Sequence, residues 1–234
     1  MEIPTQETLS AARRALRRGE LVVDRVFDQV FPPKIRRLSP VHWTPVEVAV
    51  RVASLLAVKP EARILDVGSG AGKFCLVAAA CKPAARLRGI ERRAHLVEIA
   101  EASALELGVA VEFSCGTIAE VDPSTVDGVY LFNPFAENLS PREDHIDDTI
   151  ELGEERFWHD TLAVEDFLRR ARVGTRVVTY CGWGGAIPTG YDLVLRESCA
   201  GTLELWEKGQ RSAGDEAEGC PSERRFRPRA RPHR

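Results

Sequence analysis

The segment with the clearest chemical content is a glycine-rich turn that follows a short apolar run. Its residues are Ile64-Leu65-Asp66-Val67-Gly68-Ser69-Gly70-Ala71-Gly72-Lys73-Phe74. Glycines permit unusual backbone angles and let the main chain approach a ligand closely. The turn therefore predicts a binding loop between a strand and a helix. A tight turn that binds no ligand is the alternative.

Two phosphate-binding patterns do not fit this turn. A P-loop requires four residues between its glycines and then Gly-Lys-Ser/Thr, whereas Lys73 is followed by Phe74. A dinucleotide fingerprint requires G-x-G-x-x-G, whereas the spacing here is G-x-G-x-G. The carboxylate of Asp66, two residues before the first glycine, would also face a pyrophosphate unfavourably.

The turn resembles the first motif of the class I S-adenosylmethionine-dependent methyltransferases, which Asp66-x-Gly68-x-Gly70-x-Gly72 matches without a departure. The resemblance implies that S-adenosylmethionine is the cofactor and that Gly68, Ser69, Gly70 and Gly72 pass beneath its methionine part. Asp66 is expected to orient the loop and to hold the ammonium group. A carboxylate suits a ligand that carries both a sulfonium and an ammonium.

A second acidic residue, Glu91, ends the next strand-like run, nineteen residues after Gly72. In this fold class, an acidic residue at the tip of the second strand accepts hydrogen bonds from the ribose hydroxyls. Charge-assisted bonds of that kind contribute about 1.5–3 kcal/mol. We therefore expect Glu91 to bind the ribose. A surface Glu beside Arg92 and Arg93 is the alternative.

The segment after the third strand departs from the family pattern. Family members usually have Gly followed by Asp or Asn, whose side chain contacts the adenine amino group, whereas here Gly116 is followed by Thr117. We expect the Thr117 hydroxyl, or main-chain groups beside it, to contact the adenine.

Asn133-Pro134-Phe135 stands where a fourth strand ends, and ligands in open α/β sheets bind beyond the carboxyl ends of the strands. It resembles the Asn/Asp-Pro-Pro-aromatic motif of methyltransferases that act on amino or amide nitrogens, with one proline missing. The resemblance implies that the Asn133 oxygen and the Pro134 carbonyl accept hydrogen bonds from the target nitrogen, that Phe135 packs against its plane, and that Asn133 borders the cofactor. Such positioning requires no metal. An Asn cap beside a core Phe is the alternative.

His42-Trp43-Thr44-Pro45 precedes the glycine turn. Similar aromatic-Thr-Pro segments border the cofactor in several nitrogen-directed methyltransferases, so Thr44 is a candidate cofactor contact. A helix start with a Thr44 cap and Pro45 at its first position is the alternative. Asn133-Pro134-Phe135-Ala136 is also similar to a segment of the non-SET histone lysine methyltransferases, over too few residues to transfer a substrate.

Apolar runs that alternate with helical stretches must position these residues. Strands are expected at 63–67, 87–91, 109–115, 128–132, 174–181, 191–197 and 202–207, and helices at 73–80, 94–107 and 161–171. The alternation predicts a doubly wound α/β fold, with a mostly parallel seven-stranded sheet and a terminal antiparallel pair. Helical spacing over 6–31, a loop to Trp43 and a helix from Thr44-Pro45 towards Lys59-Pro60 predict a helical N-terminal cap.

Composition divides the chain into a cap at 1–60, a cofactor-binding domain at 61–209 with an insert at 137–160, and a tail at 210–234. The net charge is −3, but the last twelve residues carry six Arg and one Glu, which leaves −8 for the rest. Residues 137–165 contain ten acidic residues and two Arg. This stretch is a candidate lid for a cationic small molecule or protein, or simply a solvated face, and it disfavours duplex DNA. The tail is expected to be disordered, with nucleic acid or the acidic insert as candidate contacts.

Several classes of protein are disfavoured. No apolar run approaches the ~20 residues of a membrane span, and the N-terminus lacks a secretory pattern. The six cysteines form no C-x-x-C pair, which suits a reduced cytoplasm, and the scarcity of Lys among the basic residues suggests a bacterial origin. Asp144-His145-Asp147-Asp148 lacks a metal-ligand spacing, so no metal is expected.

Together the motifs predict a cytoplasmic S-adenosylmethionine-dependent methyltransferase that methylates a nitrogen of a small molecule or protein. A non-catalytic protein that binds S-adenosylmethionine and acts through partners is the alternative from another class.

Overall fold

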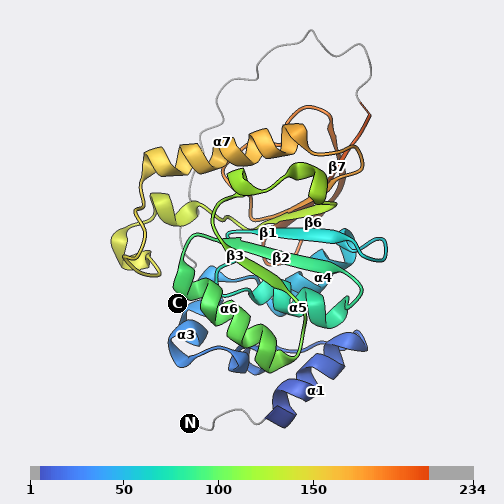
Figure 1. Ribbon diagram of the computed structural model, residues 1–234, viewed down its shortest axis with the longest axis vertical. Helices are drawn as coiled ribbons and strands as arrows, with labels where there is room; N and C mark the ends of the chain where they lie inside the picture. The colour runs from blue at the N-terminus through green and yellow to red at the C-terminus, as the bar shows by residue number, and fades with distance from the viewer. Residues whose placement is uncertain (1–5, 211–234) are drawn as a thin grey trace.

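A seven-stranded, mostly parallel sheet lies between two layers of helices (Figure 1). The computed structural model describes residues 6–210. The strand order is β3-β2-β1-β4-β5-β7-β6, and β7 is antiparallel to both of its neighbours. The strands are β1 (Arg63–Val67), β2 (Arg86–Glu91), β3 (Glu112–Cys115), β4 (Gly128–Leu131), β5 (Arg176–Tyr180), β6 (Tyr191–Ser198) and β7 (Thr202–Lys208). The predicted doubly wound fold with its terminal antiparallel pair is confirmed.

The direction of strand addition reverses in the middle of the sheet. From β1 the chain adds β2 and then β3 on one side, whereas β4 and β5 are added on the other side. A reversal of this kind opens a crevice at the carboxyl ends of the central strands. The segments that follow Val67, Glu91 and Leu131 therefore meet at one edge of the sheet.

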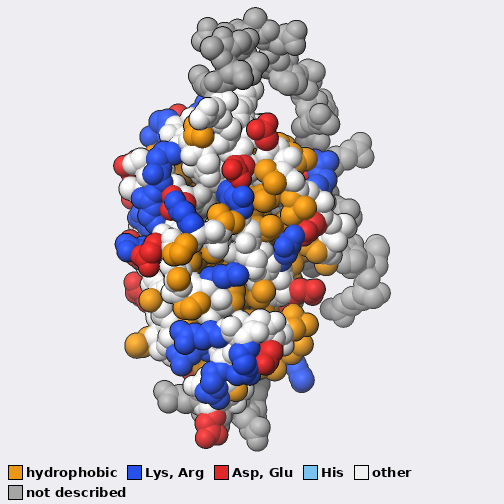
Figure 2. Space-filling model, turned by 90° about the vertical axis from the view of Figure 1, so that its right-hand side faces the viewer, with side chains coloured by type: hydrophobic (Ala, Val, Ile, Leu, Met, Phe, Trp, Pro, Cys, Tyr) orange, Lys and Arg blue, Asp and Glu red, His pale blue; other side chains and the backbone are white. Residues whose placement is uncertain are grey.

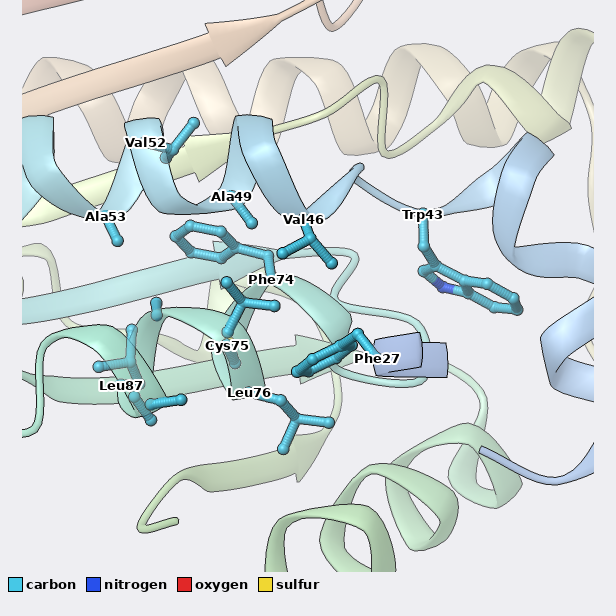
Figure 3. Packing of buried hydrophobic residues seen from close by; sticks show 14 of the residues in the cluster. Phe27, Trp43, Val46, Ala49, Val52, Ala53, Phe74, Cys75, Leu76 and Leu87 are labelled. Carbon is cyan, nitrogen blue, oxygen red and sulfur yellow. The ribbon is translucent and has the colours of Figure 1, made fainter. Parts of the chain in front are cut away.

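Helices cover both faces of the sheet, which explains why β1 and β4 are buried along almost their whole length. One face carries α4 (Val46–Leu56), α5 (Lys73–Cys81) and α6 (Ala94–Leu107), and the other carries α7 (Glu154–Arg170) (Figure 1). The small side chains of α4 and α5 allow the two helices to pack closely, with Ala49 and Ala53 on the side of α4 that faces α5 (Figure 3). The short 3₁₀ turns are η1 (Asp28–Val30), η2 (Ile118–Glu120), η3 (Pro123–Thr125), η4 (Ala136–Leu139) and η5 (Arg142–Asp144).

The N-terminal cap is helical, but its elements differ from those predicted. Helical spacing over 6–31 is divided into α1 (Gln6–Arg17), α2 (Asp24–Phe27) and η1, because Gly19 adopts a left-handed φ of 75° and ends α1. The predicted loop up to Trp43 is wrong, since α3 (Pro33–His42) occupies it. Pro33 takes the first position of α3, where the missing N–H costs no helical hydrogen bond.

The start of α4 also differs from the prediction. The Thr44 hydroxyl does not cap the helix; it shares a hydrogen bond of 2.9 Å with the Tyr130 hydroxyl. The Val46 amide instead donates to Asp24 Oδ1 at 3.0 Å, so a residue of α2 satisfies the first turn of α4.

The remaining boundaries lie close to those expected, except that α7 begins at Glu154 rather than 161 and β3 begins at Glu112 rather than 109. The insert at 137–160 therefore contains η4, η5 and the first turns of α7. The domain limits at 60 and 209 stay predictions. The predicted tail lies outside the described residues, apart from Gln210.

Candidate active site

A cavity of about 330 Å³ lies at the carboxyl ends of the central strands. Its walls come from the glycine turn, the ends of β2 and β4, the turn after β3, and the insert. A second cavity, of about 20 Å³, shares Trp43, Gly68 and Phe132 with it. The segments predicted from the sequence thus line two adjoining cavities.

The glycine turn can form only with glycine at its central positions. Gly68, Gly70 and Gly72 all have a left-handed φ, between 55° and 82°. A Cβ at Gly68 would lie 2.8 Å from Pro134 Cβ, and a Cβ at Gly70 would overlap the indole nitrogen of Trp43. The turn therefore brings backbone, rather than side chains, to the cavity wall.

Glu91 is buried beside this turn, with both oxygens held by main-chain amides. Gly70 N–H donates to Oε2 at 3.0 Å, and Arg93 N–H donates to Oε1 at 2.9 Å. Each carboxylate oxygen can accept a further hydrogen bond. Glu91 lines the larger cavity, so this remaining capacity suits a pair of hydroxyls.

Asp66 lies under the turn and lines the smaller cavity. Burial raises the pKa of Asp66 to about 7; the Cys75 thiol, 3.6 Å from Oδ2, acts to lower it, and the charge of Glu91 acts to raise it. The nearby Ser69 hydroxyl is buried without a hydrogen-bond partner among the described residues. The Asp66 carboxylate can accept from an ammonium, and the Ser69 hydroxyl can donate to a carboxylate. These two groups fit the amino acid part of S-adenosylmethionine.

Thr117 lines the larger cavity, but its polar groups face Glu120. The Thr117 amide donates to Glu120 Oε1 at 2.8 Å, and the hydroxyl donates to the same oxygen at 3.2 Å. The two residues form a capping box at the start of η2. In the capping box the Thr117 hydroxyl also accepts the Glu120 amide, which leaves that oxygen one further lone pair, and adenine recognition by Thr117 stays a prediction.

Asn133, Pro134 and Phe135 all line the larger cavity. Asn133 has a left-handed φ of 43°, and its main-chain N–H donates to the Gly182 carbonyl at 3.0 Å. Phe135 is 8% exposed and belongs to the apolar cluster on the α7 side of the sheet. Phe135 therefore contributes to the core as well as to the cavity wall.

The acidic insert, which lines the larger cavity, is held by Arg93, two residues after the end of β2. Arg93 is buried, and its guanidinium lies 2.9 Å from Glu137 and 3.0 Å from Asp147. Although burial acts to raise the pKa of Asp147, hydrogen bonds from Thr149 and Arg93 hold it at about 2. The insert contributes Glu137, Asn138, Ser140, Asp144, Ile146, Ile150 and Leu152 to the wall.

The structure adds residues that the motifs did not select. Trp43 lines both cavities and covers Gly70, Phe132 lines both cavities, and Arg93 holds the insert. The sequence carried a signal for Trp43, which directly precedes Thr44-Pro45. It carried none for Arg93, because its partners lie more than forty residues away.

Two further observations concern the described residues only. No group of three or more His, Cys, Asp or Glu side chains within residues 6–210 is arranged to hold a metal ion. None of the helices formed by those residues has both the length and the apolar character of a membrane span.

Comparison with known proteins identifies a methyltransferase domain in part of the chain. Residues 58–150 match a family model described as a methyltransferase domain. An RNA methyltransferase from Salinibacter ruber, solved with S-adenosyl-L-homocysteine, has a TM-score of 0.55 and 25% identity, over 75% of this chain and 99% of that chain. No curated protein matches the chain.

Two other solved structures share the fold. TrmN from Thermus thermophilus has a TM-score of 0.52 and 20% identity, over 70% of this chain and 49% of that chain. A mutant of MtNAS in complex with S-adenosylmethionine has a TM-score of 0.54 and 12% identity, over 88% of this chain and 73% of that chain.

The matched domain contains the glycine turn, Asp66, Glu91 and Asn133, and two of the similar structures hold S-adenosylmethionine or its product. The donors and acceptors around both cavities fit the same group. Residues 58–150 are therefore a methyltransferase domain, similar to the S-adenosylmethionine-dependent methyltransferases of class I, and S-adenosylmethionine is its cofactor.

Proposed function

We propose that the protein methylates a nitrogen atom of a small molecule or a protein. When bound, S-adenosylmethionine supplies a methyl group made electrophilic by the adjacent sulfonium. The observation that carries the proposal is the contact between Pro134 and the cofactor loop: a Cβ at Gly68 would lie 2.8 Å from Pro134 Cβ and 3.5 Å from the Pro134 carbonyl oxygen. The segment that resembles the nitrogen-directed motif thus lies beside the turn that holds the methyl donor.

Main-chain hydrogen bonds support this segment, although one proline of the motif is missing. The main-chain N–H of Asn133 donates to the Gly182 carbonyl, and the main-chain carbonyl of Asn133 accepts from the Ala136 N–H at 3.2 Å. In the proposed reaction, the nitrogen to be methylated donates hydrogen bonds to the Asn133 side-chain oxygen and to the Pro134 carbonyl. They hold its lone pair towards the methyl group, and such orientation is the main source of rate enhancement.

The ion pairs of the insert bear on the charge of the acceptor. Glu137 and Asp147 are matched by Arg93, and Asp160 is matched by Arg92 and Arg156. Carboxylates paired with guanidinium groups attract a further cation only weakly. A cationic small molecule or protein would therefore be attracted by the exposed Glu143, Glu151 and Glu155 rather than by these paired groups.

A nucleobase nitrogen in RNA is a second candidate. The Salinibacter ruber RNA methyltransferase is covered over 99% of its length at 25% identity. Residues 6–42 carry eight Lys or Arg and four Asp or Glu, and two of those acids bind the buried Lys73. Lys34 and Arg37 of α3 are exposed. They lie at helical spacing from Val41, which lines the larger cavity, so the three residues share one face of the helix. Figure 2 shows one face of the molecule, on which Lys and Arg side chains lie among acidic and apolar ones.

Incubation of the purified protein with methyl-labelled S-adenosylmethionine and fractionated cell extract tests both candidates. We expect the label in the small-molecule or protein fraction, on nitrogen, and at least about 100-fold slower transfer by Asn133→Ala. S-adenosylhomocysteine affinity is measured in parallel, so that weaker cofactor binding by the variant can be told from slower methyl transfer. Label in RNA would favour the second candidate. Label on oxygen or carbon, or equal transfer by Asn133→Ala, would contradict the nitrogen proposal.

A further inference from the structure

The side chain of Lys73, the first residue of α5, is buried among the N-terminal helices rather than in the cofactor site. It is only 2% exposed. Its ammonium lies 2.6 Å from Asp24 Oδ1 and 2.7 Å from Asp28 Oδ1. It also donates to the Ser39 hydroxyl at 2.8 Å. A lysine that follows the last glycine of the cofactor turn thus joins α2, η1 and α3.

The same cluster reaches α4. Asp24 Oδ1, which binds Lys73, also accepts a hydrogen bond from Val46 N–H at 3.0 Å. The two helices on either side of Trp43 are therefore both attached to the ammonium, α3 through Ser39 and α4 through Asp24.

Trp43 connects this cluster to the cofactor site. It is buried between α3 and α4, and its indole nitrogen lies so close to Gly70 that no Cβ fits there. Trp43 also lines both cavities. The glycine turn is consequently held on two sides: Gly72 leads into Lys73 through the chain, and Gly70 lies beneath Trp43 through space.

A buried ammonium is stable only with well-placed partners, because an uncompensated buried charge costs several kcal/mol. The three oxygen partners can all reach Lys73 only when α2, η1 and α3 occupy fixed positions. The cluster therefore selects one arrangement of the cap against α5, and that arrangement puts Trp43 over the turn.

We propose that Lys73 is a positioning residue for cofactor binding, which holds Trp43 against the glycine turn through Asp24 and Ser39. The N-terminal helices are then part of the cofactor site, although their charged residues lie outside the cavities. The inference goes beyond the proposed function and does not depend on the acceptor being a nitrogen.

Lys73→Met tests the inference, because methionine keeps most of the length of the side chain and removes the charge. We expect S-adenosylhomocysteine binding, measured by calorimetry, to weaken by about 10-fold or more, as for other displacements at a distance from the chemistry. Hydrogen–deuterium exchange should become faster at residues 41–47 and 68–72. Lys59→Met is the matched control: it removes an exposed ammonium 3.2 Å from Asp127, and neither readout should change.

A charge-matched variant separates positioning from simple stability. Lys73→Met combined with Asp24→Asn and Asp28→Asn leaves no unpaired buried charge, so its Tm should return towards that of the wild type. We expect its affinity for S-adenosylhomocysteine to stay weak and its exchange at 41–47 to stay fast. Recovery of affinity together with Tm, or wild-type affinity in a folded Lys73→Met, would overturn the proposal.

A milder substitution covers the case in which both variants fail to fold. The Asp24 side chain is 45% exposed, so Asp24→Ala removes the bonds to Lys73 and Val46 without opening a buried hole. Asp24→Asn keeps an oxygen that can accept both bonds. Weaker binding by Asp24→Ala, largely restored by Asp24→Asn, is expected. Unchanged binding by both would overturn the proposal, and none of these outcomes bears on the identity of the acceptor.

Discussion

The carboxylate of Glu91 accepts a hydrogen bond from the main-chain amide of Gly70 at 3.0 Å. The residue that we expect to bind the ribose therefore also fixes the turn expected beneath the methionine part. The two halves of the cofactor site share one side chain, and a change at either half should alter the other.

Glu91→Gln should weaken S-adenosylhomocysteine binding by about 10- to 100-fold, which corresponds to the roughly 1.5–3 kcal/mol of a charge-assisted hydrogen bond. The amide group of Gln would place a donor against either the Gly70 or the Arg93 N–H, and both oxygens accept in the wild type. Calorimetric titration measures the effect. Glu112→Gln, on a side chain 72% exposed at the sheet edge, is the control. Similar affinities for the two variants would contradict the role of Glu91.

Cofactor binding should depend on pH through Asp66. Because burial raises the pKa of Asp66 to about 7, the carboxylate becomes protonated as the pH falls below 7 and loses its attraction for an ammonium. S-adenosylhomocysteine affinity should therefore decrease from pH 8 to pH 5 in the wild type. The affinity of Asp66→Asn should be weak and independent of pH over the same range. A flat wild-type profile would show that Asp66 does not contact the ligand.

The same carboxyl group predicts an opposite effect on stability. The folded protein keeps the Asp66 proton up to about pH 7, whereas the unfolded chain loses it near pH 4. The free energy of unfolding should therefore fall between those pH values and stay low above them. In urea unfolding without ligand, Asp66→Asn should be more stable than the wild type at pH 8. The difference in the free energy of unfolding between the two proteins should be much smaller at pH 4. Equal stabilities at pH 8 would refute this.

Gly70→Ala should be damaging for two reasons that can be separated. A left-handed φ costs a non-glycine residue about 1–2 kcal/mol, and overlap with Trp43 adds about 1–3 kcal/mol of overpacking. Gly174→Ala, with a φ of 81° and open space around it, should show only the first cost and keep full S-adenosylhomocysteine affinity. When Trp43→Leu is combined with Gly70→Ala, the double variant should recover part of the stability lost in Gly70→Ala alone. No recovery would indicate that Trp43 does not confine the turn.

Arg93→Met should release the insert. The substitution leaves Glu137 and Asp147 without their buried cation, which typically costs about 3–5 kcal/mol. Faster tryptic cleavage after Arg142 and lower stability in urea are expected. Arg142→Met removes an exposed pair with Asp148 and should change the free energy of unfolding by less than about 1 kcal/mol. An Arg93→Met protein as stable as the wild type would contradict the fastening role.

The local parts of the fold were predictable from sequence. The bounds of β1 and α6 agree with the prediction, because an apolar run before a glycine turn and a periodic apolar stretch ended by Gly108 are local signals. The convergence of Asp66, Glu91 and Asn133 also follows from topology, since parallel strands bring their carboxyl ends to one edge.

The errors concern residues whose partners are distant in sequence. The alternative of a Thr44 cap is wrong, because the Thr44 hydroxyl shares a hydrogen bond with that of Tyr130, eighty-six positions away, and Asp24 accepts the Val46 amide instead. Neither hydrogen bond leaves a local pattern. Thr44 lines the smaller cavity, and its contact with the cofactor stays a prediction. A count of charges in the insert likewise could not reveal that Arg93 neutralises Glu137 and Asp147. Composition predicted an acidic surface, whereas packing turned part of it into a buried ionic contact.

The place of β7 in the sheet has a consequence for the synthesis of the chain. Although β7 is the last strand in sequence, it lies between β5 and β6 and supplies hydrogen bonds to both. A nascent chain whose residues up to 198 have left the ribosome, while residues 202–208 are still inside it, therefore presents the unpaired edge of β5, and β6 has no neighbour within the sheet. Exposed edges of this kind invite pairing with other chains. Nascent chains arrested at that stage should consequently be the species most dependent on chaperones.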